Sequence, residues 1–221
     1  MTKNNYARNL ILCLGISLWM GTGNIFAAGT SEKDVSVSGG IKADATFLNF
    51  LAQKAPGTTS TLTPGFALGG FTDIRFNDWI GLRPEVNLNF KQTVMSWEQS
   101  GGRMQSFGIE VPIYVTARFK AFKSHHILLG IGPYTEFSCY ARWIIDGRKV
   151  DLLEVHEDGE PMIQDTQSGF GAMLGYEFGN GMAVNLAYRL CCFNILQPNT
   201  SQGVSLYPQS ISLGFAYRFG K

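Results

Sequence analysis

Hydrophobic and polar side chains alternate with a period of two along most of the chain. In residues 79–97, for example, Ile80 and Leu82 belong to one face while Arg83 and Glu85 belong to the other. This period is typical of a β-strand whose two faces meet different surroundings. The pattern recurs and predicts eight strands, at residues 35–49, 64–76, 79–97, 106–120, 125–145, 168–178, 182–194 and 209–219.

The two faces of these strands differ sharply in charge. The apolar faces contain no charged side chain, whereas the opposite faces carry fourteen. These fourteen are Lys42, Asp44, Asp73, Arg75, Arg83, Glu85, Lys91, Glu110, Arg118, Lys120, Glu136, Glu177, Arg189 and Arg218.

The expected connections alternate in length along the chain. Three are tight turns, at Asn77-Asp78, around Lys123 and at Gly179–Gly181. Four are longer, at 50–63, 98–105, 146–167 and 195–208. An even number of antiparallel strands, with short turns at one end and long loops at the other, is typical of outer-membrane barrels.

Alternation alone does not decide which face points outward, because an exported soluble barrel such as a lipocalin would bury its apolar face. Glycine on the charged face favours the membrane arrangement. In a narrow eight-stranded barrel, glycine makes room for long charged side chains, whereas it only weakens a strand that faces water. The glycines concerned are Gly69, Gly81, Gly130, Gly132, Gly171, Gly175 and Gly214.

Aromatic residues gather near both ends of the expected strands, as in the two interfacial belts of a membrane barrel. The short-turn end has Phe76, Trp79, Phe119, Phe122, Phe178 and Phe219. The long-loop end has Phe47, Phe66, Phe90, Trp97, Phe107, Phe137 and Trp143. We therefore predict an all-β fold, a closed antiparallel eight-stranded transmembrane β-barrel. The fourteen charges would form a structural network in its lumen, because buried charges must be paired.

The 146–167 segment is strongly acidic and leaves one alternative open. Asp146-Gly147 is a hairpin signal, so the preceding strand is expected to fold back through 148–155 as a ribbon outside the membrane. If the ribbon instead joined the wall, the barrel would have ten strands. The acids indicate a solvated loop that faces lipopolysaccharide, or else a site for a divalent cation or a cationic partner.

Composition excludes several classes of protein. Charged residues make up 16% of the 221 residues, against about 25% in soluble domains. The hydrophobic fraction of 45% excludes disorder. No run of apolar residues is long enough for a spanning helix. The formal net charge of +1 argues against a nucleic-acid partner.

Residues 1–28 have the pattern of a secretory signal peptide. Lys3 and Arg8 precede the apolar stretch Leu10–Met20, and small residues around Ala28 end the segment. We expect cleavage there, which leaves residues 29–221 as the barrel domain of the mature protein.

Several strand phrases resemble the small outer-membrane β-barrel family that includes PorT-like proteins, often called porin-like. The phrases are Gly39–Lys42, Pro64–Phe66, Leu82–Glu85, Ile109–Pro112, Gly132–Tyr134, Gly175–Phe178 and the final strand Ser212–Phe219. The final strand, with its closing aromatics, is also similar to the C-terminal signal read by the barrel assembly machinery. The resemblance implies an eight-stranded barrel in the outer membrane of a Gram-negative-type bacterium, and some members are linked to protein secretion.

Candidate chemistry is sparse. The expected layout separates His125 and His126 from His156, and no serine, histidine and acid motif is present, so we expect no catalytic residue, cofactor or metal. Cys139, Cys191 and Cys192 are too few and too scattered for a disulfide framework.

The predicted function is a structural or interaction role, in which a monomer displays its loops at the cell surface. Its partners would be outer-membrane lipid, lipopolysaccharide, the barrel assembly machinery and a protein bound at the loops or turns. Two alternatives stay open: a narrow porin-like channel for small solutes, and a periplasm-facing component of a secretion complex.

Overall fold

A computed structural model describes residues 35–53, 57–97, 100–155, 161–197 and 203–219. The chain divides into two units, Met1–Lys33 and Asp34–Lys221. The first unit, and with it the expected signal peptide and its cleavage site, lies outside the described residues. No helix among the described residues is long and apolar enough to cross a membrane. The account below concerns the second unit.

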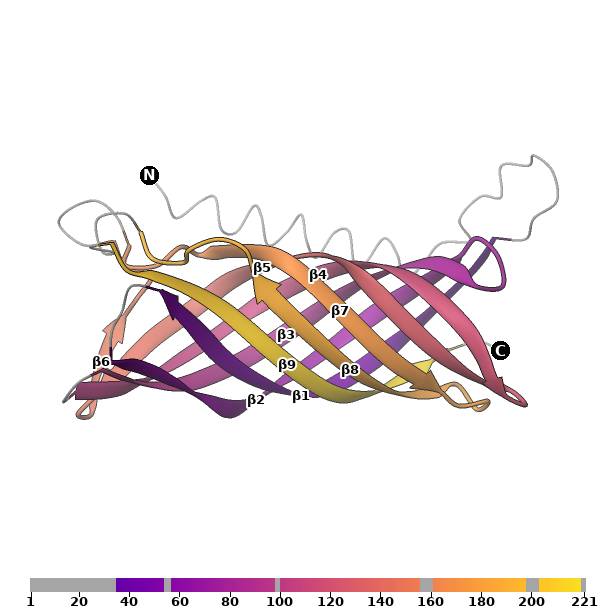
Figure 1. The fold of residues 1–221 in the computed structure, drawn as a ribbon, viewed down its shortest axis with the longest axis horizontal. Helices are drawn as coiled ribbons and strands as arrows, with labels where there is room; N and C mark the ends of the chain where they lie inside the picture. The colour runs from indigo at the N-terminus through magenta and orange to yellow at the C-terminus, as the bar shows by residue number, and fades with distance from the viewer. Residues whose placement is uncertain (1–34, 54–56, 98–99, 156–160, 198–202, 220–221) are drawn as a thin grey trace. The chain divides into compact units, whose positions relative to one another are not determined.

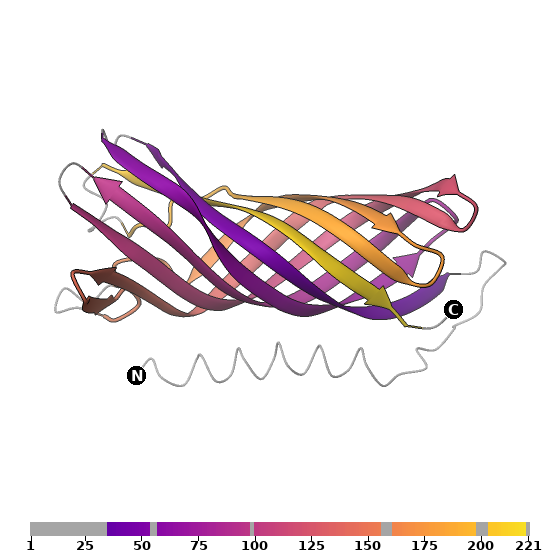
Figure 2. The ribbon, with the colours of Figure 1, turned by 90° about the horizontal axis from the view of Figure 1, so that it is seen from below.

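Antiparallel strands make up almost all of this unit (Figures 1 and 2). They are β1 (Ser36–Gln53), β2 (Thr58–Arg75), β3 (Ile80–Trp97), β4 (Ser100–Phe122), β5 (His125–Ile145), β6 (Arg148–Asp151), β7 (Thr166–Glu177), β8 (Met182–Cys191) and β9 (Ser205–Arg218).

Eight of these strands pair into a ring. Their order is β4-β3-β2-β1-β9-β8-β7-β5, and β5 pairs in turn with β4. The seam between the first and last strands is long, because β1 pairs with β9 from Gly40–Arg218 to Gln53–Ser205. The expected closed eight-stranded antiparallel barrel is therefore confirmed. The strand β6 pairs only with the end of β5, so the ten-stranded alternative is wrong.

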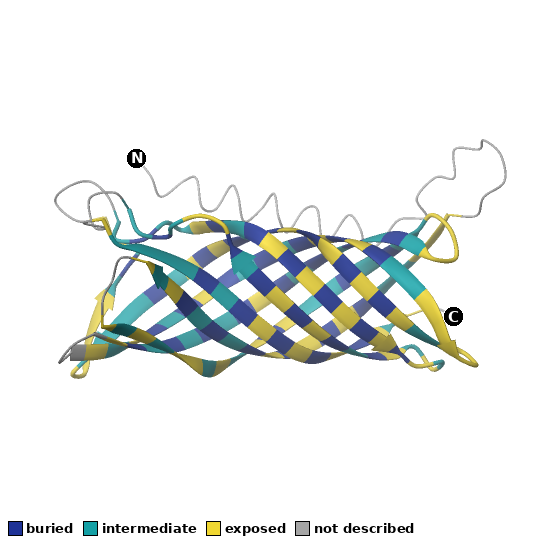
Figure 3. Ribbon diagram, viewed as in Figure 1, coloured by how far each residue is buried: buried dark blue, intermediate teal, exposed yellow. Residues whose placement is uncertain are grey.

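Side chains alternate between buried and exposed along every strand of the ring, which gives the chequerboard of Figure 3. In β3, Arg83 and Glu85 are each only 1% exposed, whereas Leu88 is 47% exposed. On β9, Leu213 is 52% exposed and its neighbour Ser212 is 1% exposed. The charged face therefore lines the lumen and the apolar face covers the outside of the barrel.

The two ends of the barrel are unlike. One end, called the turn end here, carries the short connections 76–79, 123–124 and 178–181. The other, called the ribbon end, carries a two-stranded ribbon in which β6 pairs with Arg142–Ile145 of β5. The ribbon turns at Asp146 and Gly147, whose φ angles of 49° and 79° fit the predicted hairpin turn.

The predictions of long loops at 50–63 and 98–105 are wrong, because strands occupy most of both segments. Most of 50–63 belongs to β1 and β2, and most of 98–105 belongs to β4. The pairing of β2 with β3 continues through Leu62–Thr93 after a register shift between Leu62 and Phe66. Beyond that shift Thr59, Thr61 and Leu62 are all exposed. The regular alternation of apolar and polar residues, on which the strand prediction relied, is therefore lost there although the pairing of the strands continues.

The expected outward position of Trp143 is also wrong, and the cause is a β-bulge. Tyr140 pairs with Phe107 and Ser138 pairs with Gly108, so Cys139 is the extra residue in β5. One extra residue reverses the alternation beyond it. Trp143 therefore packs against the buried cluster inside the ribbon end.

A charge on the outer wall tests this polarity. Leu213→Arg should lower the free energy of unfolding in a bilayer by about 2–4 kcal/mol, because arginine would lie near the bilayer midplane. Thr61→Arg, at an exposed β2 position toward the ribbon end, is the matched control and should cost under about 0.5 kcal/mol. Urea titration of both variants in vesicles provides the comparison, and equal losses would contradict the proposed membrane position.

Candidate functional site: the charged lumen

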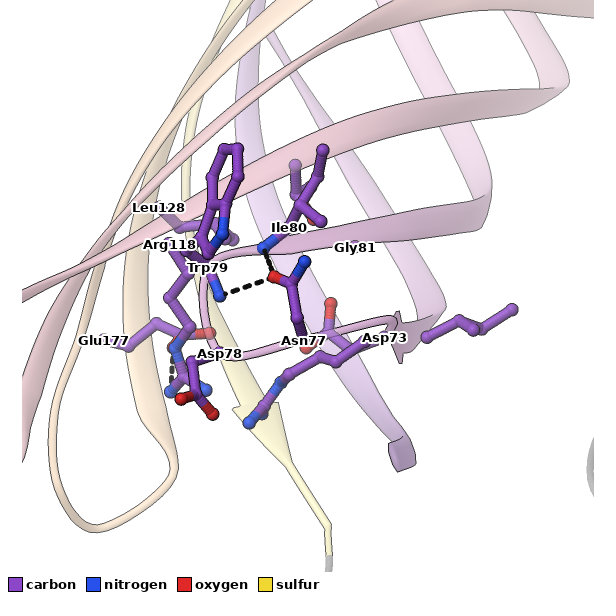
Figure 4. A pocket seen from close by; sticks show the side chains of 12 residues that line it. Asp73, Asn77, Asp78, Trp79, Ile80, Gly81, Arg118, Leu128 and Glu177 are labelled. Carbon is purple, nitrogen blue, oxygen red and sulfur yellow. Dashed lines mark hydrogen bonds and ion pairs between the residues drawn. The ribbon is translucent and has the colours of Figure 1, made fainter. Parts of the chain in front are cut away.

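The lumen is filled at three levels, and the level nearest the turn end is a cluster of ion pairs around Glu177. Arg118 and Glu177 form an ion pair (Figure 4). Arg218 Nη1 lies 3.3 Å from Glu177 Oε1 and 3.9 Å from Asp73 Oδ2. Arg118 Nη2 also lies 3.3 Å from Nδ1 of His126. Three strands on different sides of the ring, β4, β7 and β9, are thus joined across the mouth.

The turn that borders this cluster is fixed by its own side chain. Asn77 Oδ1 accepts hydrogen bonds from the backbone N–H groups of Trp79, at 3.0 Å, and Ile80, at 2.7 Å (Figure 4). The cavity between this turn, Arg118 and Glu177 has a volume of about 10 Å³, which is room for roughly one water molecule. A wider hollow of about 620 Å³ lies at the rim, but its lining stops at the outermost residues of β1, β2 and β9.

The middle level is a dense network in which each charge has a partner of opposite sign. Lys42 Nζ lies 2.8 Å from Glu85 Oε2 and 3.0 Å from Asp44 Oδ2. Arg83 Nε donates to Glu85 Oε1 at 3.1 Å, and its guanidinium also stacks 3.7 Å from the centroid of the Phe71 ring. Arg83 Nη1 lies 3.7 Å from Asp73 Oδ1, which joins this level to the turn-end cluster.

A second part of the middle level centres on Glu110, which is fully buried. Lys91 Nζ lies 3.3 Å from Glu110 and 2.5 Å from Glu136. Arg189 Nε lies 3.0 Å from Glu110 Oε1, an ion pair without hydrogen-bond alignment, while its Nη1 donates to Ser212 Oγ at 3.0 Å. Asn87 Nδ2 is 3.4 Å from both Glu85 and Glu110, so it links the two parts.

Tyr114 fills the centre of the lumen beside this network. The ring is fully buried among Leu128, Met173 and Ala187. Its hydroxyl lies against Gly171, where an added Cβ would come within 3.1 Å of the oxygen. Glycine on the facing strand therefore makes room for a large lumen side chain, as the sequence pattern predicts.

The third level, inside the ribbon end, is apolar rather than ionic. A cluster here called the apolar plug joins lumen-facing strand residues to the segments 151–153, 162–163 and 194–196. The hydrogen bonds Leu152 N to Ala141 O, Ile163 N to Leu152 O and Ile195 N to Leu206 O hold these segments in the mouth. The buried members are Leu48, Phe50, Met95, Met104, Ala141, Leu152, Ile163, Cys191 and Ile195.

The structure places twelve of the fourteen predicted lumen charges in ion pairs. Two differ. Lys120 is exposed because it lies at the end of β4, beside a register shift that precedes Phe122, so it is a correction to the expected network. Arg75 is half-buried at the rim and has no ion pair among the described residues. The twelve are Lys42, Asp44, Asp73, Arg83, Glu85, Lys91, Glu110, Arg118, Glu136, Glu177, Arg189 and Arg218.

Sequence reasoning missed the apolar plug. The 146–167 segment was expected to be a solvated acidic loop, yet Leu152 and Ile163 are 7% and 3% exposed. The apolar residues between the acids of this segment, such as Leu152 and Ile163, were the available signal. Within the described residues, no group of three histidine, cysteine or acidic side chains could hold a metal ion, and the three described cysteines are free.

A family model described as the outer membrane protein β-barrel domain matches residues 20–219. The chain belongs to this family. Its place is therefore the outer membrane, and the outward apolar face of the barrel is the face that meets lipid. No curated protein matches the chain.

Solved structures similar to this barrel include three outer-membrane proteins. Neisserial surface protein A is 17% identical over 83% of this chain and 99% of its own, with a TM-score of 0.46. OprG of Pseudomonas aeruginosa is 15% identical over 84% and 95%, with a TM-score of 0.45. Ail of Yersinia pestis is 13% identical over 82% and 98%, with a TM-score of 0.41.

The network around Glu110 can be tested by removing one partner. Glu110→Ala should lower the free energy of unfolding of the folded barrel by about 3–5 kcal/mol, because it leaves the buried Arg189 cation uncompensated. Lys120→Ala, at an exposed position, should change it by less than about 0.5 kcal/mol. The double variant Glu110→Leu/Arg189→Met should recover part of the loss, since no charge is then stranded. Urea unfolding of the four proteins measures this, and a Glu110→Ala cost equal to that of Lys120→Ala would contradict the network.

Proposed function

We propose that this protein is a non-conducting, non-enzymatic outer-membrane barrel that acts through its surface, as a structural or interaction protein. The observation that carries the proposal is the filling of the lumen by twelve paired charges and an apolar plug. A barrel that transports solutes needs a continuous path through its centre. Here the centre is occupied by side chains from strands on all sides of the ring.

The electrostatics of the lumen support the same conclusion. Six bases and six acids form the ion pairs, so the network is balanced in charge. Ion-selective pores usually present a ring of one sign, which attracts the permeating ion and releases it again. In a balanced set of close pairs, each charged group already has a protein partner of opposite sign. A passing ion therefore finds no free binding site there.

The ribbon end is the surface best suited to an interaction, because it projects beyond the wall and carries most of the exposed charge outside the turns. With the longer loops displayed at the cell surface, as the sequence pattern predicts, this end faces outward. Lipopolysaccharide and a protein partner at the loops are the proposed contacts, and the barrel would reach the membrane through the assembly machinery that reads its final strand.

Our second proposal is that the protein belongs to the PorT-like subgroup and has a role in protein secretion. It rests on the strand phrases alone. Under it, the short connections of the turn end would meet the partner complex in the periplasm. Pull-down after mild detergent extraction would test it: co-purification of envelope secretion components supports it, and a barrel that purifies alone contradicts it.

Planar-bilayer recording tests the main proposal. The full-length mature protein should give no steady single-channel current at any moderate voltage, because no open path crosses the network and the plug. A general porin in the same bilayer provides the positive control for insertion and recording. Regular current steps of fixed size from the wild-type barrel would overturn the proposal in favour of a narrow channel.

A further inference from the structure

Three cationic side chains lie together on the outer face of the ribbon end. Arg103 of β4 pairs in register with Ile144 of β5, and Ile144 pairs with Lys149 of β6. Arg142 is two residues from Ile144 on the same strand and therefore on the same face. We name the group of Arg103, Arg142 and Lys149 the outer basic cluster.

The outer basic cluster lies at the level of lipid headgroups. Tyr140 and Phe107 pair with each other at the edge of the aromatic belt, and the Arg142 guanidinium lies 4.5 Å from the centroid of the Tyr140 ring. Two residues along a tilted strand rise by about 5 Å. The headgroup layer on each side of a bilayer is roughly 5–7 Å deep. The Arg142 charge therefore lies within this layer.

None of the three cations has an ion pair with another described residue within 4.0 Å. Asp151 is the register partner of Arg142 on β6. Its Oδ1 accepts a hydrogen bond from the backbone N–H of Leu153 at 3.1 Å, which holds the carboxylate at the end of β6. The cluster thus presents positive charge that the described protein does not neutralise.

Among the described residues, outward charge at this end lies in one sector of the wall. The described outward side chains toward the ribbon end of β1, β2, β3 and β9 are uncharged. They include Asn49, Leu51, Thr61, Gln92, Val94 and Gln209. A general need for solubility beyond the membrane would spread charge around the ring. Among the described strand residues, the outward cations of this end lie on β4, β5 and β6, which fits a localised anionic ligand.

We propose that the outer basic cluster binds the phosphate of a lipid headgroup in the surrounding leaflet. Phosphate in that layer is the anion within reach, and the planar fork of arginine matches phosphate geometry. With the ribbon end outward, the lipid is lipopolysaccharide, through the phosphates of its lipid A. The inference rests on the proposed function, which turns the ribbon end toward lipopolysaccharide, but it does not depend on whether the lumen conducts.

Native mass spectrometry of the folded full-length protein in detergent, titrated with diphosphoryl lipid A, tests the site. The triple variant Arg103→Gln/Arg142→Gln/Lys149→Gln should lose on the order of 100-fold in lipid A affinity, and Arg142→Gln alone about 5-fold. Lys120→Gln/Lys123→Gln, which removes exposed cations of the turn end, should bind as the wild type does. The heat-induced gel shift of folded barrels verifies folding, and Arg103→Gln and Lys149→Gln singly replace the triple variant if it does not fold.

Three further probes identify the source of the phosphate. Dephosphorylated lipid A should bind weakly to wild type and triple variant alike. Phosphatidylglycerol that binds as tightly as lipid A, with the same loss in the triple variant, supports a lipid phosphate site without selection for lipopolysaccharide. Equal lipid retention by wild type and triple variant overturns the proposal, as does complete displacement of the lipid by millimolar inorganic phosphate.

Discussion

In hydrocarbon, every backbone N–H and C=O must find its partner within the protein, and this constraint determines the rest of the structure. A sheet meets it only when its first and last strands pair, which the long β1–β9 seam achieves. Closure with eight strands makes the lumen narrow enough for side chains to fill. Long side chains such as Arg83 and Arg189 fit because glycines on the lumen face leave room. Their charges, removed from water, must then be paired with acids.

The lumen and the outer face of the ribbon end place charge in two different settings. Within the lumen, cations such as Lys42 and Lys91 each contact two carboxylates, so their charge is compensated by the protein itself. On the outside, Arg103, Arg142 and Lys149 have no such partner among the described residues. Compensated charge gives rigidity and a closed centre, whereas uncompensated charge at the lipid surface attracts a ligand. Arginine and lysine thus stabilise the barrel where acids surround them in the lumen, and under our proposal they bind a lipid phosphate where they face the membrane surface.

Alternation made the wall of the barrel predictable from the sequence. A two-residue period with one charge-free face identifies both the strands and the lumen side, and it placed Arg83, Glu85 and Glu110 correctly. It failed where a single residue changes the register. The bulge at Cys139 turned the side chain of Trp143 from the outer face to the lumen. The register shift near Phe122 left Lys120 outside the charged network. The apolar plug could not be predicted for another reason. Leu152, Ile163 and Ile195 belong to connections in which apolar and polar residues follow no regular period, and these residues meet only once the ring has closed.

The inverted polarity of the barrel is the central claim, and oxygen accessibility measured by spin-label EPR tests it most directly. Nitroxides would be attached one at a time at positions 211, 212, 213, 215 and 216 of β9 in lipid vesicles, with Cys139, Cys191 and Cys192 replaced by serine. Oxygen concentrates in lipid, so the account predicts high accessibility to oxygen at Ile211, Leu213 and Phe215, and low accessibility at Ser212 and Ala216. High accessibility at the second set, or no alternation at all, would contradict it.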